Sequence, residues 1–469
     1  MKHVEVFTLF IILMIAESCL PSARKQKEHY PTKPNIIFIM ADDLGYADPG
    51  CYGQESIQTP HIDQLAAEGL QFTQCYSGAA VCAPARSVLM TGRHTGHTTV
   101  RGNFGRGGVT GLGGGEGRVP LAEEDVTIAQ LLQRAGYRTA MVGKWGLGEP
   151  HTSGEPNKKG FDEFFGFLNQ RRAHSYYPEY IWKDTTRYPL AGNQNGLKKQ
   201  YTHDLFAEYA LDFIKRNAGQ PFFLYLPFCI PHEAYEIADL GKYKGKVWND
   251  TLKAYAAMVS RLDSTVGLIM QTLKEVGIEE KTWVFFTSDN GPAHITGNWE
   301  LFNSNGPLRG GKRDAYEGGI RVPMIVRYPG TVPSGKSSDL VWYFADILPT
   351  LADITGIKPP ENIDGISVLP TLSGKQQGIS DRYLYWEFYE KKGWRATRFG
   401  DWKAIQQGMN QAVHQPVELY NLKEDGGEAH DLATQFPELV LKAEQIFGEA
   451  HDPSPNFVWK YLLDSIGKQ

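Results

Sequence analysis

The chain has 469 residues, a formal net charge of -5 at pH 7 and 41% hydrophobic residues. This length exceeds the size at which one hydrophobic core usually stops growing, so we expect a large domain and a smaller one. The acidic balance, without a clustered run of basic residues, argues against a protein that binds nucleic acid.

Residues 1–18 are predicted to be a signal peptide. The apolar stretch ends near Ala16, is too short to span a bilayer and is interrupted by Glu5. Two processing routes stay open, because residues 16–18 fit a cleavage site while residues 16–19 resemble a bacterial lipoprotein box that would lipidate Cys19. We favour the lipoprotein and expect an exported protein, periplasmic or lipid-anchored at the bacterial outer membrane or cell surface. The alternative is an apolar tail on a cytosolic protein.

Short apolar strands alternate with helical patterns through residues 30–374. Strands are predicted at residues 35–40, 139–143, 222–228, 283–288 and 323–328. Helices are predicted at residues 61–69, 126–136 and 253–277. This alternation predicts an α/β domain over residues 30–374, in which helices sandwich a large, mostly parallel sheet.

The residue pattern changes after Gly374. Aromatic and polar residues mingle between turns in residues 382–405, which is typical of antiparallel strands, and residues 437–450 follow with a helical pattern. Residues 375–469 are therefore predicted to form a smaller α+β domain.

Cys82 precedes a predicted helix. Pro84 suits the first turn of a helix, and no helix breaker follows before Gly92. The aligned peptide dipoles at a helix N-terminus favour negative charge, so a side chain at Cys82 can become an oxyanion. The alternative is a small buried core residue, because free cysteine packs like a small hydrophobe. The cysteines beyond Cys19 are too few and scattered for a disulfide framework, and at most one disulfide is expected.

Polar side chains follow four of the predicted strands. In chain order these are Asp42 and Asp43, Lys144, His232, and Asp289 with Asn290. Ligands of open α/β sheets bind outside the carboxyl ends of the strands, so these groups can converge on one crevice. Each also has a plain alternative as a turn former, a helix cap or a solvated surface group.

Four of these groups suit a metal ion. The carboxylates of Asp42, Asp43 and Asp289 and the amide oxygen of Asn290 are hard oxygen ligands, typical of Ca²⁺ or Mg²⁺ sites. No spacing of histidine and cysteine suggests zinc.

The remaining groups suit a tetrahedral anion. Lys144, His232 and Lys312 are cationic or hydrogen-donating, and Arg86 lies one helical turn beyond Cys82. A metal opposite several donors suits in-line transfer of a sulfuryl or phosphoryl group.

Six motifs occur together in one order. They are ADDLGY (41–46), CAPAR (82–86), GYRTAMVGKW (136–145), SDNGP (288–292), GKRDAYEGGIRVP (311–323) and DGISVLP (364–370). In these motifs the chain resembles the type I, formylglycine-dependent sulfatases of the alkaline phosphatase superfamily. The resemblance covers about residues 34–374 and extends to a small C-terminal antiparallel sheet with a helix.

The resemblance implies a maturation step and a metal set. A formylglycine-generating enzyme would oxidise Cys82 to Cα-formylglycine, whose hydrated aldehyde is the nucleophile and a metal ligand. Ca²⁺ would bind this group together with Asp42, Asp43, Asp289 and Asn290.

The resemblance also implies roles for the donors. Arg86 would hold the hydrated aldehyde, and Lys144 and Lys312 would bind sulfate oxygens. His232 would act as an acid toward the departing alcohol.

The chain departs from the family pattern within CAPAR and directly after GYRTAMVGKW. Ala85 stands where serine is common, and Gly146 stands where many members have a histidine that contacts the nucleophile. The nearest replacement is His97, and we expect its glycine-punctuated loop to fold back to Cys82 with Arg101 and Asn103 available to the substrate. The alternative is a loop histidine bonded to the backbone.

The predicted substrates are sulfate esters of sugars in host or algal glycans, or aryl sulfates. Specificity is expected from loops. The best candidate is the segment 170–182, in which Arg172, His174 and Tyr176 can hydrogen-bond sugar hydroxyls. The alternative is an aromatic loop with a structural role.

Two other functions remain open. A phosphatase or phosphodiesterase of the same superfamily would use a serine or threonine nucleophile and typically zinc ligands, neither of which the motifs suggest. An unmodified Cys82 would leave a glycan-binding lipoprotein without turnover.

Overall fold

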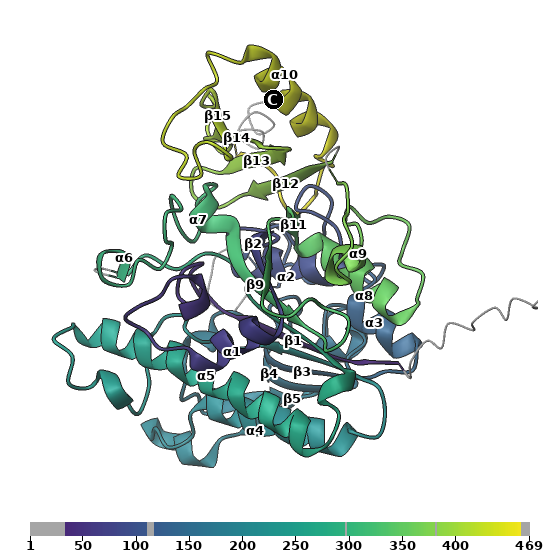
Figure 1. Cartoon of the computed structure of the whole chain (residues 1–469), viewed down its shortest axis with the longest axis vertical. Helices are drawn as coiled ribbons and strands as arrows, with labels where there is room; N and C mark the ends of the chain where they lie inside the picture. Colours follow the sequence, from purple (N-terminus) through teal and green to yellow (C-terminus); the bar gives the residue numbers. More distant parts are fainter. Residues whose placement is uncertain (1–32, 110–116, 296–297, 380–381, 461–469) are drawn as a thin grey trace, which may run out of the picture. The chain divides into compact units, whose positions relative to one another are not determined.

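Eleven strands form one large sheet in the part of the chain that the computed structural model describes, residues 33–109, 117–295, 298–379 and 382–460. The strands are β1 (Asn35–Ala41), β2 (Leu70–Tyr76), β3 (Arg138–Lys144), β4 (Glu163–Phe167), β5 (Tyr180–Lys183), β6 (Thr186–Pro189), β7 (Phe222–Pro227), β8 (Thr282–Ser288), β9 (Arg321–Arg327), β10 (Lys336–Ser338) and β11 (Trp342–Tyr343). Their order is β10-β2-β9-β8-β1-β7-β3-β4-β5-β6, and β11 pairs with β2 (Figure 1).

The centre of the sheet is parallel. Strands β8, β1, β7, β3 and β4 pair in parallel as neighbours. Strand β9 runs antiparallel to both β8 and β2, and β5 runs antiparallel to β4 and β6. The prediction of a mostly parallel sheet is confirmed, and the five predicted strands correspond to β1, β3, β7, β8 and β9.

Strand β1 is buried on both faces. Ile36, Phe38 and Met40 belong to one hydrophobic core, while Ile37 and Ile39 belong to the other. A central parallel strand covered by helices on both sides needs apolar residues at every position, which explains the unbroken apolar run.

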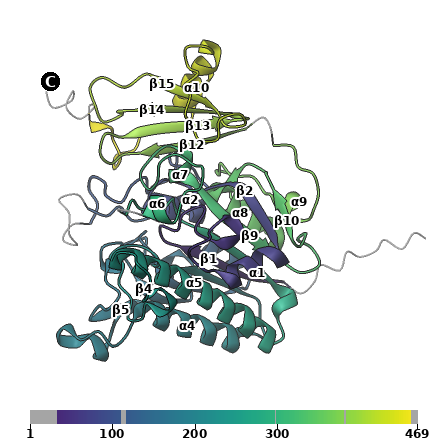
Figure 2. The ribbon, with the colours of Figure 1, turned by 60° about the vertical axis from the view of Figure 1, so that its left-hand side comes forward.

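Helices cover both faces. The helices of the large domain are α1 (Pro60–Glu68), α2 (Cys82–Thr91), α3 (Ile128–Arg134), α4 (Thr202–Asn217), α5 (Asp250–Glu275), α6 (Asn298–Leu301), α7 (Glu317–Ile320), α8 (Ile347–Thr355) and α9 (Leu369–Leu372). Helices α2, α3 and α8 contribute to the core on one face, and α1, α4 and α5 contribute to the core on the other. Figure 2 shows α4 and α5 side by side along their face of the sheet.

Two of the predicted helices have side-chain N-caps. The Thr127 hydroxyl accepts the Gln130 backbone N–H, and the Gln130 side chain accepts the Thr127 N–H, so α3 starts with a capping box. The long helix α5 starts at Asn249, whose side chain accepts the Leu252 N–H at 2.9 Å. Because of these caps, α3 starts two residues later than the apolar pattern alone predicts, and α5 starts three residues earlier.

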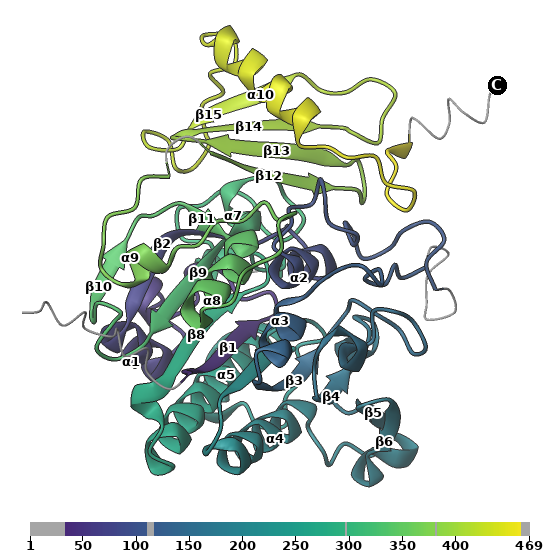
Figure 3. The same cartoon turned by 90° about the vertical axis from the view of Figure 1, so that its right-hand side faces the viewer.

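The C-terminal part is a four-stranded antiparallel sheet with one helix (Figure 3). Its elements are β12 (Tyr383–Phe388), β13 (Trp394–Phe399), β14 (Trp402–Gln407), β15 (Val417–Asn421) and α10 (Pro437–Glu449). One face of this sheet packs into a core shared with the large sheet, through Trp386 and Trp394 among others. The other face packs against α10, where Phe447 meets Tyr385 and Leu419. The predicted α+β segment is confirmed.

An ionic contact also joins the C-terminal sheet to helix α7 of the large domain. The buried Lys403 ammonium of β14 lies 3.0 Å from Glu317 of α7 and 2.9 Å from Glu428. Residues Pro34–Gln469 accordingly form one compact unit. The domain boundary expected after Gly374 stays a prediction.

The predicted signal peptide and Cys19 lie outside the described residues. In the described ranges, no helix combines the length and the apolar character needed to cross a membrane.

Candidate active site

Strand ends bring the predicted polar residues together. Asp42 and Asp43 follow β1, Asp289 and Asn290 follow its neighbour β8, and Lys144 ends β3. These side chains are at most 1% exposed. Because β8, β1, β7 and β3 are adjacent and parallel, their carboxyl ends meet at one edge, as the sequence indicates.

Cys82 lies at the same edge as the first residue of α2. Its ligand atom and those of Asp42 and Asp289 all lie within 4.8 Å of one another. The Cys82 Sγ is 3.7 Å from Asn103 Oδ1, which also accepts the Ala83 N–H at 3.2 Å. Cys82 thus faces the carboxylates with its backbone held by Asn103. Cys51, Cys75, Cys82 and Cys229 are all free thiols.

Arg86 binds the carboxylates. Its Nη2 lies 2.7 Å from Asp289 Oδ2 and 3.1 Å from Asp42 Oδ2, and its Nη1 donates to the Lys144 carbonyl. The side chain is fully buried. Arg86 therefore fixes the spacing of two carboxylates from different strands, whereas the resemblance implies a contact with the modified Cys82.

Two lysines also bind the carboxylates, and Lys144 shares Asp42 Oδ2 with Arg86. Lys144 Nζ lies 2.6 Å from Asp42 Oδ2, and Lys312 Nζ lies 2.6 Å from Asp43 Oδ2. With Arg86, the described site holds three cations opposite the three carboxylates of Asp42, Asp43 and Asp289.

The carboxylates titrate differently because their neighbours differ. Burial by itself raises the pKa of Asp42, but the neighbouring cations, with Lys144 first, bring it well below its usual range. Burial and the negative charge of Asp42 raise the pKa of Asp289 to about 6. Asp42 is therefore firmly ionised, and Asp289 is the carboxyl that depends most on added positive charge.

His232 follows β7 and is neutral in this geometry. Its Nδ1–H donates to the Glu233 carbonyl at 2.6 Å, so Nε2 accepts a hydrogen bond from Lys312 Nζ at 2.9 Å. Burial lowers the pKa of His232 to about 3. The proton at this position belongs to Lys312, so the expected role of His232 as an acid stays a prediction.

Two buried oxygens of the cluster lack hydrogen-bond partners. Among the described residues, Asp42 Oδ1 and Asn290 Oδ1 accept no hydrogen bond. Leaving such oxygens buried without a partner is costly, and a bound cation would remove that cost. Asp43 adopts a left-handed backbone with φ of 63°, and its N–H donates to Asp289 Oδ1 at 3.2 Å. This hard-oxygen set fits Ca²⁺ or Mg²⁺.

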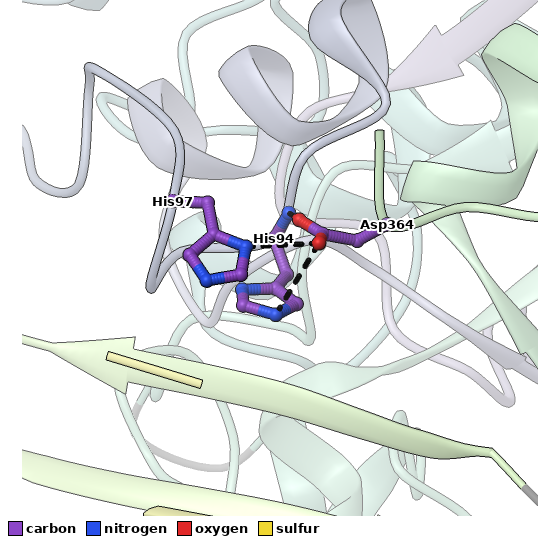
Figure 4. Close-up of side chains that lie close together, drawn as sticks. All are labelled: His94, His97 and Asp364. Atoms are coloured by element: carbon purple, nitrogen blue, oxygen red, sulfur yellow. Dashed lines mark hydrogen bonds and ion pairs between the residues drawn. The ribbon is translucent and has the colours of Figure 1, made fainter. Parts of the chain in front are cut away.

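His97 lies against Asp364 (Figure 4). Its Nδ1 is 2.8 Å from Asp364 Oδ1, and its ring stacks on His94 at 4.1 Å. His94 Nδ1 accepts the Gly96 N–H, so its Nε2 carries a proton and has no lone pair for a metal. The expectation that His97 folds back to Cys82 is not supported, because Asp364 holds its loop.

Arg101 is likewise tied elsewhere. It is 3% exposed, its Nε donates to the Thr98 carbonyl at 3.0 Å, and its Nη1 donates to the Asp452 carbonyl at 2.7 Å. These contacts anchor the loop to the C-terminal segment, so the expected contact of Arg101 with substrate is not supported. Its neighbour Asn103, considered only for substrate contact in the sequence, is the residue that touches Cys82.

The segment 170–182 has several roles. His174 approaches the site, since its ring lies 4.4 Å from that of His232. Tyr176 is buried, and its hydroxyl donates to the carbonyls of Cys229 and His232, so it supports the backbone and is not available to a sugar. Arg172 stacks on Tyr180 at 3.9 Å. Of the three predicted sugar contacts, only His174 lies against the catalytic cluster.

The comparison with protein families decides the class of this site. A family model described as Sulfatase matches residues 34–357. This range includes the first five of the six motifs. The chain belongs to the sulfatase family. A second model, described as N-sulphoglucosamine sulphohydrolase, C-terminal, matches residues 310–445 of this sulfatase.

Curated relatives and solved structures agree with the family. The sulfatase is 35% identical to the N-acetylgalactosamine-6-sulfatase of Homo sapiens over 399 residues, covering 80% of this chain and 72% of the relative. It is 32% identical to human arylsulfatase A, covering 88% and 87%. The crystal structure of Ps i-CgsB in complex with k-i-k-neocarrahexaose matches with a TM-score of 0.79 and 29% identity, covering 93% and 97%. The resemblance to the alkaline phosphatase superfamily is confirmed, and the protein is a sulfuric ester hydrolase.

Proposed function

We propose that this sulfatase hydrolyses sulfate esters of sugars through a Cα-formylglycine made from Cys82, with Ca²⁺ as its metal. The observation that carries the proposal is the position of Cys82. It stands at the N-terminus of α2, within 4.8 Å of the carboxylates of Asp42 and Asp289 and among Arg86, Lys144 and Lys312. A nucleophile here meets both a metal site and cations for an anionic substrate.

Conversion of the Cys82 side chain to an aldehyde is a two-electron oxidation, with an external oxidant used by the modifying enzyme and loss of the thiol sulfur as sulfide. Hydration of the aldehyde supplies two hydroxyls. One attacks the ester sulfur as the S–O bond to the alcohol breaks, and deprotonation of the other expels sulfate and restores the aldehyde. A serine hydroxyl could attack in the same way but could not eliminate, because no second oxygen would remain on the carbon. The modification would be made by a formylglycine-generating enzyme before the chain folds, since Cys82 is only 3% exposed.

Asp42, Asp43, Asp289 and Asn290 would hold Ca²⁺, or Mg²⁺ through the same oxygens, and the ion would polarise a sulfate oxygen. The charge balance of the site supports these four residues as the metal ligands. Three carboxylates already face three cations, so a divalent ion makes the site net positive where a sulfate ester must bind.

The other residues have positioning and donor roles. Arg86 holds the carboxylates of Asp42 and Asp289 in place. Lys144 and Lys312 point their ammonium groups at the cluster and would donate to sulfate oxygens. Lys312 also donates to His232 Nε2, so a proton for the departing alcohol is available at this pair.

Sugars are proposed as the substrates on the basis of the relatives. The human relative is named for a 6-sulfated amino sugar, and Ps i-CgsB was crystallised with a neocarrahexaose. Aryl sulfates would be accepted as small surrogates. We also propose export by residues 1–18 and a lipid anchor at Cys19, which would place the enzyme in the periplasm or at the outer membrane or cell surface.

Sulfate release tests the proposed function. The mature enzyme should release inorganic sulfate from N-acetylgalactosamine 6-sulfate or sulfated galactose oligosaccharides, measured by ion chromatography. The matched phosphate esters are the control. Faster release of phosphate than sulfate would favour the phosphatase alternative, and binding of sulfated glycans without any release would favour the non-catalytic lipoprotein.

Replacing His174 by alanine should weaken hydrolysis of the sulfated sugar by about 10-fold in kcat/KM, the value of one hydrogen bond to a sugar hydroxyl. The effect on 4-nitrophenyl sulfate should be much smaller, because the His174 ring contacts His232, whereas Lys144 and Lys312 bind the carboxylates beside which the sulfate is expected. Steady-state kinetics on both substrates measure the difference, with Ser175→Ala as the neighbouring control. Equal losses on the two substrates would remove His174 from sugar recognition.

A further inference from the structure

Arg118 is a half-buried cation at the edge of the site. Its Nη1 donates to Gln170 Oε1 at 2.7 Å and to the Asn103 carbonyl at 3.0 Å. Its guanidinium lies over the Phe104 ring at 4.5 Å. Asn103 is the residue whose amide touches Cys82, so Arg118 is one residue removed from the nucleophile.

Arg118 differs from the other site cations in its ionic contacts. Each of the other site cations, Arg86, Lys144 and Lys312, forms an ion pair with a carboxylate at 2.6 or 2.7 Å. No described carboxylate forms an ion pair with Arg118. Burial lowers its pKa, and Cys82 is the first of the groups that oppose this effect. Glu149 and Glu390 also oppose it, but neither forms an ion pair with Arg118 in the described residues, so the guanidinium can take a further anion as a direct partner.

The position of Arg118 depends on the lack of a side chain at Gly146. Gly146 follows β3 with φ of 82°, and a Cβ there would lie 2.4 Å from Gln170 Nε2. The Gln170 amide fills this space, donates to the Gly146 carbonyl at 3.1 Å and presents its oxygen to Arg118. The absence of a side chain at residue 146 thus lets Gln170 hold Arg118 beside the nucleophile.

The hydrogen bonds of Arg118 to described residues both start from Nη1. This leaves Nε–H and Nη2–H, the pair of donors that matches the two oxygens of a carboxylate or a sulfate group. The guanidinium is thus oriented by its neighbours, and no described residue occupies its bidentate edge.

We propose that Arg118 binds a second anionic substituent of the substrate, a uronate carboxylate or an additional sulfate, next to the ester that is cleaved. The inference rests on the proposed function, because it assumes a sulfated sugar at Cys82. It makes Arg118, held by Gln170 and Gly146, a determinant of specificity for doubly charged glycans.

The test compares singly and doubly charged sugars. The mature enzyme is assayed for kcat/KM on N-acetylgalactosamine 6-sulfate, on its 4,6-disulfate, and on the 6-sulfated chondroitin disaccharide that carries a uronate. The wild type should prefer at least one doubly charged sugar over the singly charged one by about 10- to 100-fold, the value of a charge-assisted bidentate contact. If the enzyme prefers the 4,6-disulfate, the second substituent is a sulfate. If it prefers the disaccharide with the uronate, the second substituent is a carboxylate.

Variants assign the preference to Arg118. Arg118→Gln should lose it, and Arg118→Lys should recover part of it because the charge remains. Arg106→Gln, which removes an exposed arginine of the same loop, should leave it unchanged. Matching unfolding midpoints show that the variants are folded.

The outcomes separate the two proposals. A wild type that cleaves these sugars without preference, or an Arg118→Gln enzyme that keeps the preference, would overturn the role of Arg118 alone. A wild type that cleaves 4-nitrophenyl sulfate but no sulfated sugar would overturn the sugar substrate and, with it, the role of Arg118.

Discussion

A Cys82→Ser enzyme is expected to lose turnover of sulfate esters by about 10⁴-fold or more, as for removal of a covalent nucleophile. The serine hydroxyl would occupy the same helix N-terminus, with the same Asn103 contact to the Ala83 N–H. It could accept the sulfuryl group once but has no second hydroxyl with which to release it. Serine at residue 82 should therefore give at most one turnover.

Two measurements check this result. Steady-state kinetics on 4-nitrophenyl sulfate give the loss of kcat, and intact mass spectrometry after incubation shows whether a sulfated protein accumulates. Cys51→Ser is the control, since Cys51 is a free thiol bonded through its backbone to Asp63 away from the cluster. Turnover by Cys82→Ser within about 10-fold of the wild type would contradict the formylglycine mechanism.

Replacing Asp289 by alanine is expected to remove both the metal and activity, with a loss in kcat of about 10³-fold or more, the scale of one strong electrostatic contribution to the transition state. Asp289 joins the buried set at two points, because it binds Arg86 at 2.7 Å and accepts the Asp43 N–H at 3.2 Å. Its removal would leave Arg86 with one carboxylate partner and the metal oxygens with less negative charge.

Metal analysis separates this prediction from unfolding. The wild type should contain stoichiometric calcium or magnesium, lose activity in excess chelator and regain it when Ca²⁺ is restored. Asp289→Ala should contain no stoichiometric metal at an unchanged unfolding midpoint, whereas Asp212→Ala, on the exposed surface of α4, should match the wild type. Stoichiometric zinc, or full activity in chelator, would contradict the assigned metal set.

The metal residues could be predicted because strands define them. Asp42, Asp43, Asp289 and Asn290 each follow an apolar run that is buried on both faces, and such runs predict adjacent parallel strands whose ends meet. Lys144 ends a third strand of the same group. The expected convergence follows from sheet geometry and needs no knowledge of loop conformation.

The loop residues could not be predicted in the same way. His97 and Arg101 lie in a glycine-rich segment, and their partners, Asp364 and Asp452, are separated from them by hundreds of residues. Tyr176 has the chemistry of a sugar ligand, but its hydroxyl is used by two backbone carbonyls. Composition gives the chemistry of a loop side chain, while only the tertiary structure gives its partner.

Asn103 and Gln170 show the converse case. The sequence indicates only a contact with substrate for Asn103 and no role of its own for Gln170 within the segment 170–182, yet Asn103 touches Cys82 and Gln170 fills the space beside Gly146. The sequence did carry one signal, the glycine at residue 146 in place of a histidine. That glycine indicated that another side chain must take the place of the family histidine. The contact between Gln170 and Gly146 shows that Gln170 occupies this space.

Hydrolysis by this sulfatase is proposed to depend on the conversion of Cys82 to a formylglycine. Peptide mass spectrometry of the mature enzyme tests it most directly, on the fragment that contains CAPAR at residues 82–86. The fragment should have the mass at which the thiol is replaced by an aldehyde. The fraction of chains with this mass should rise and fall with kcat when the enzyme is produced with or without the formylglycine-generating enzyme. A fully active preparation in which the fragment carries only unmodified cysteine would contradict it.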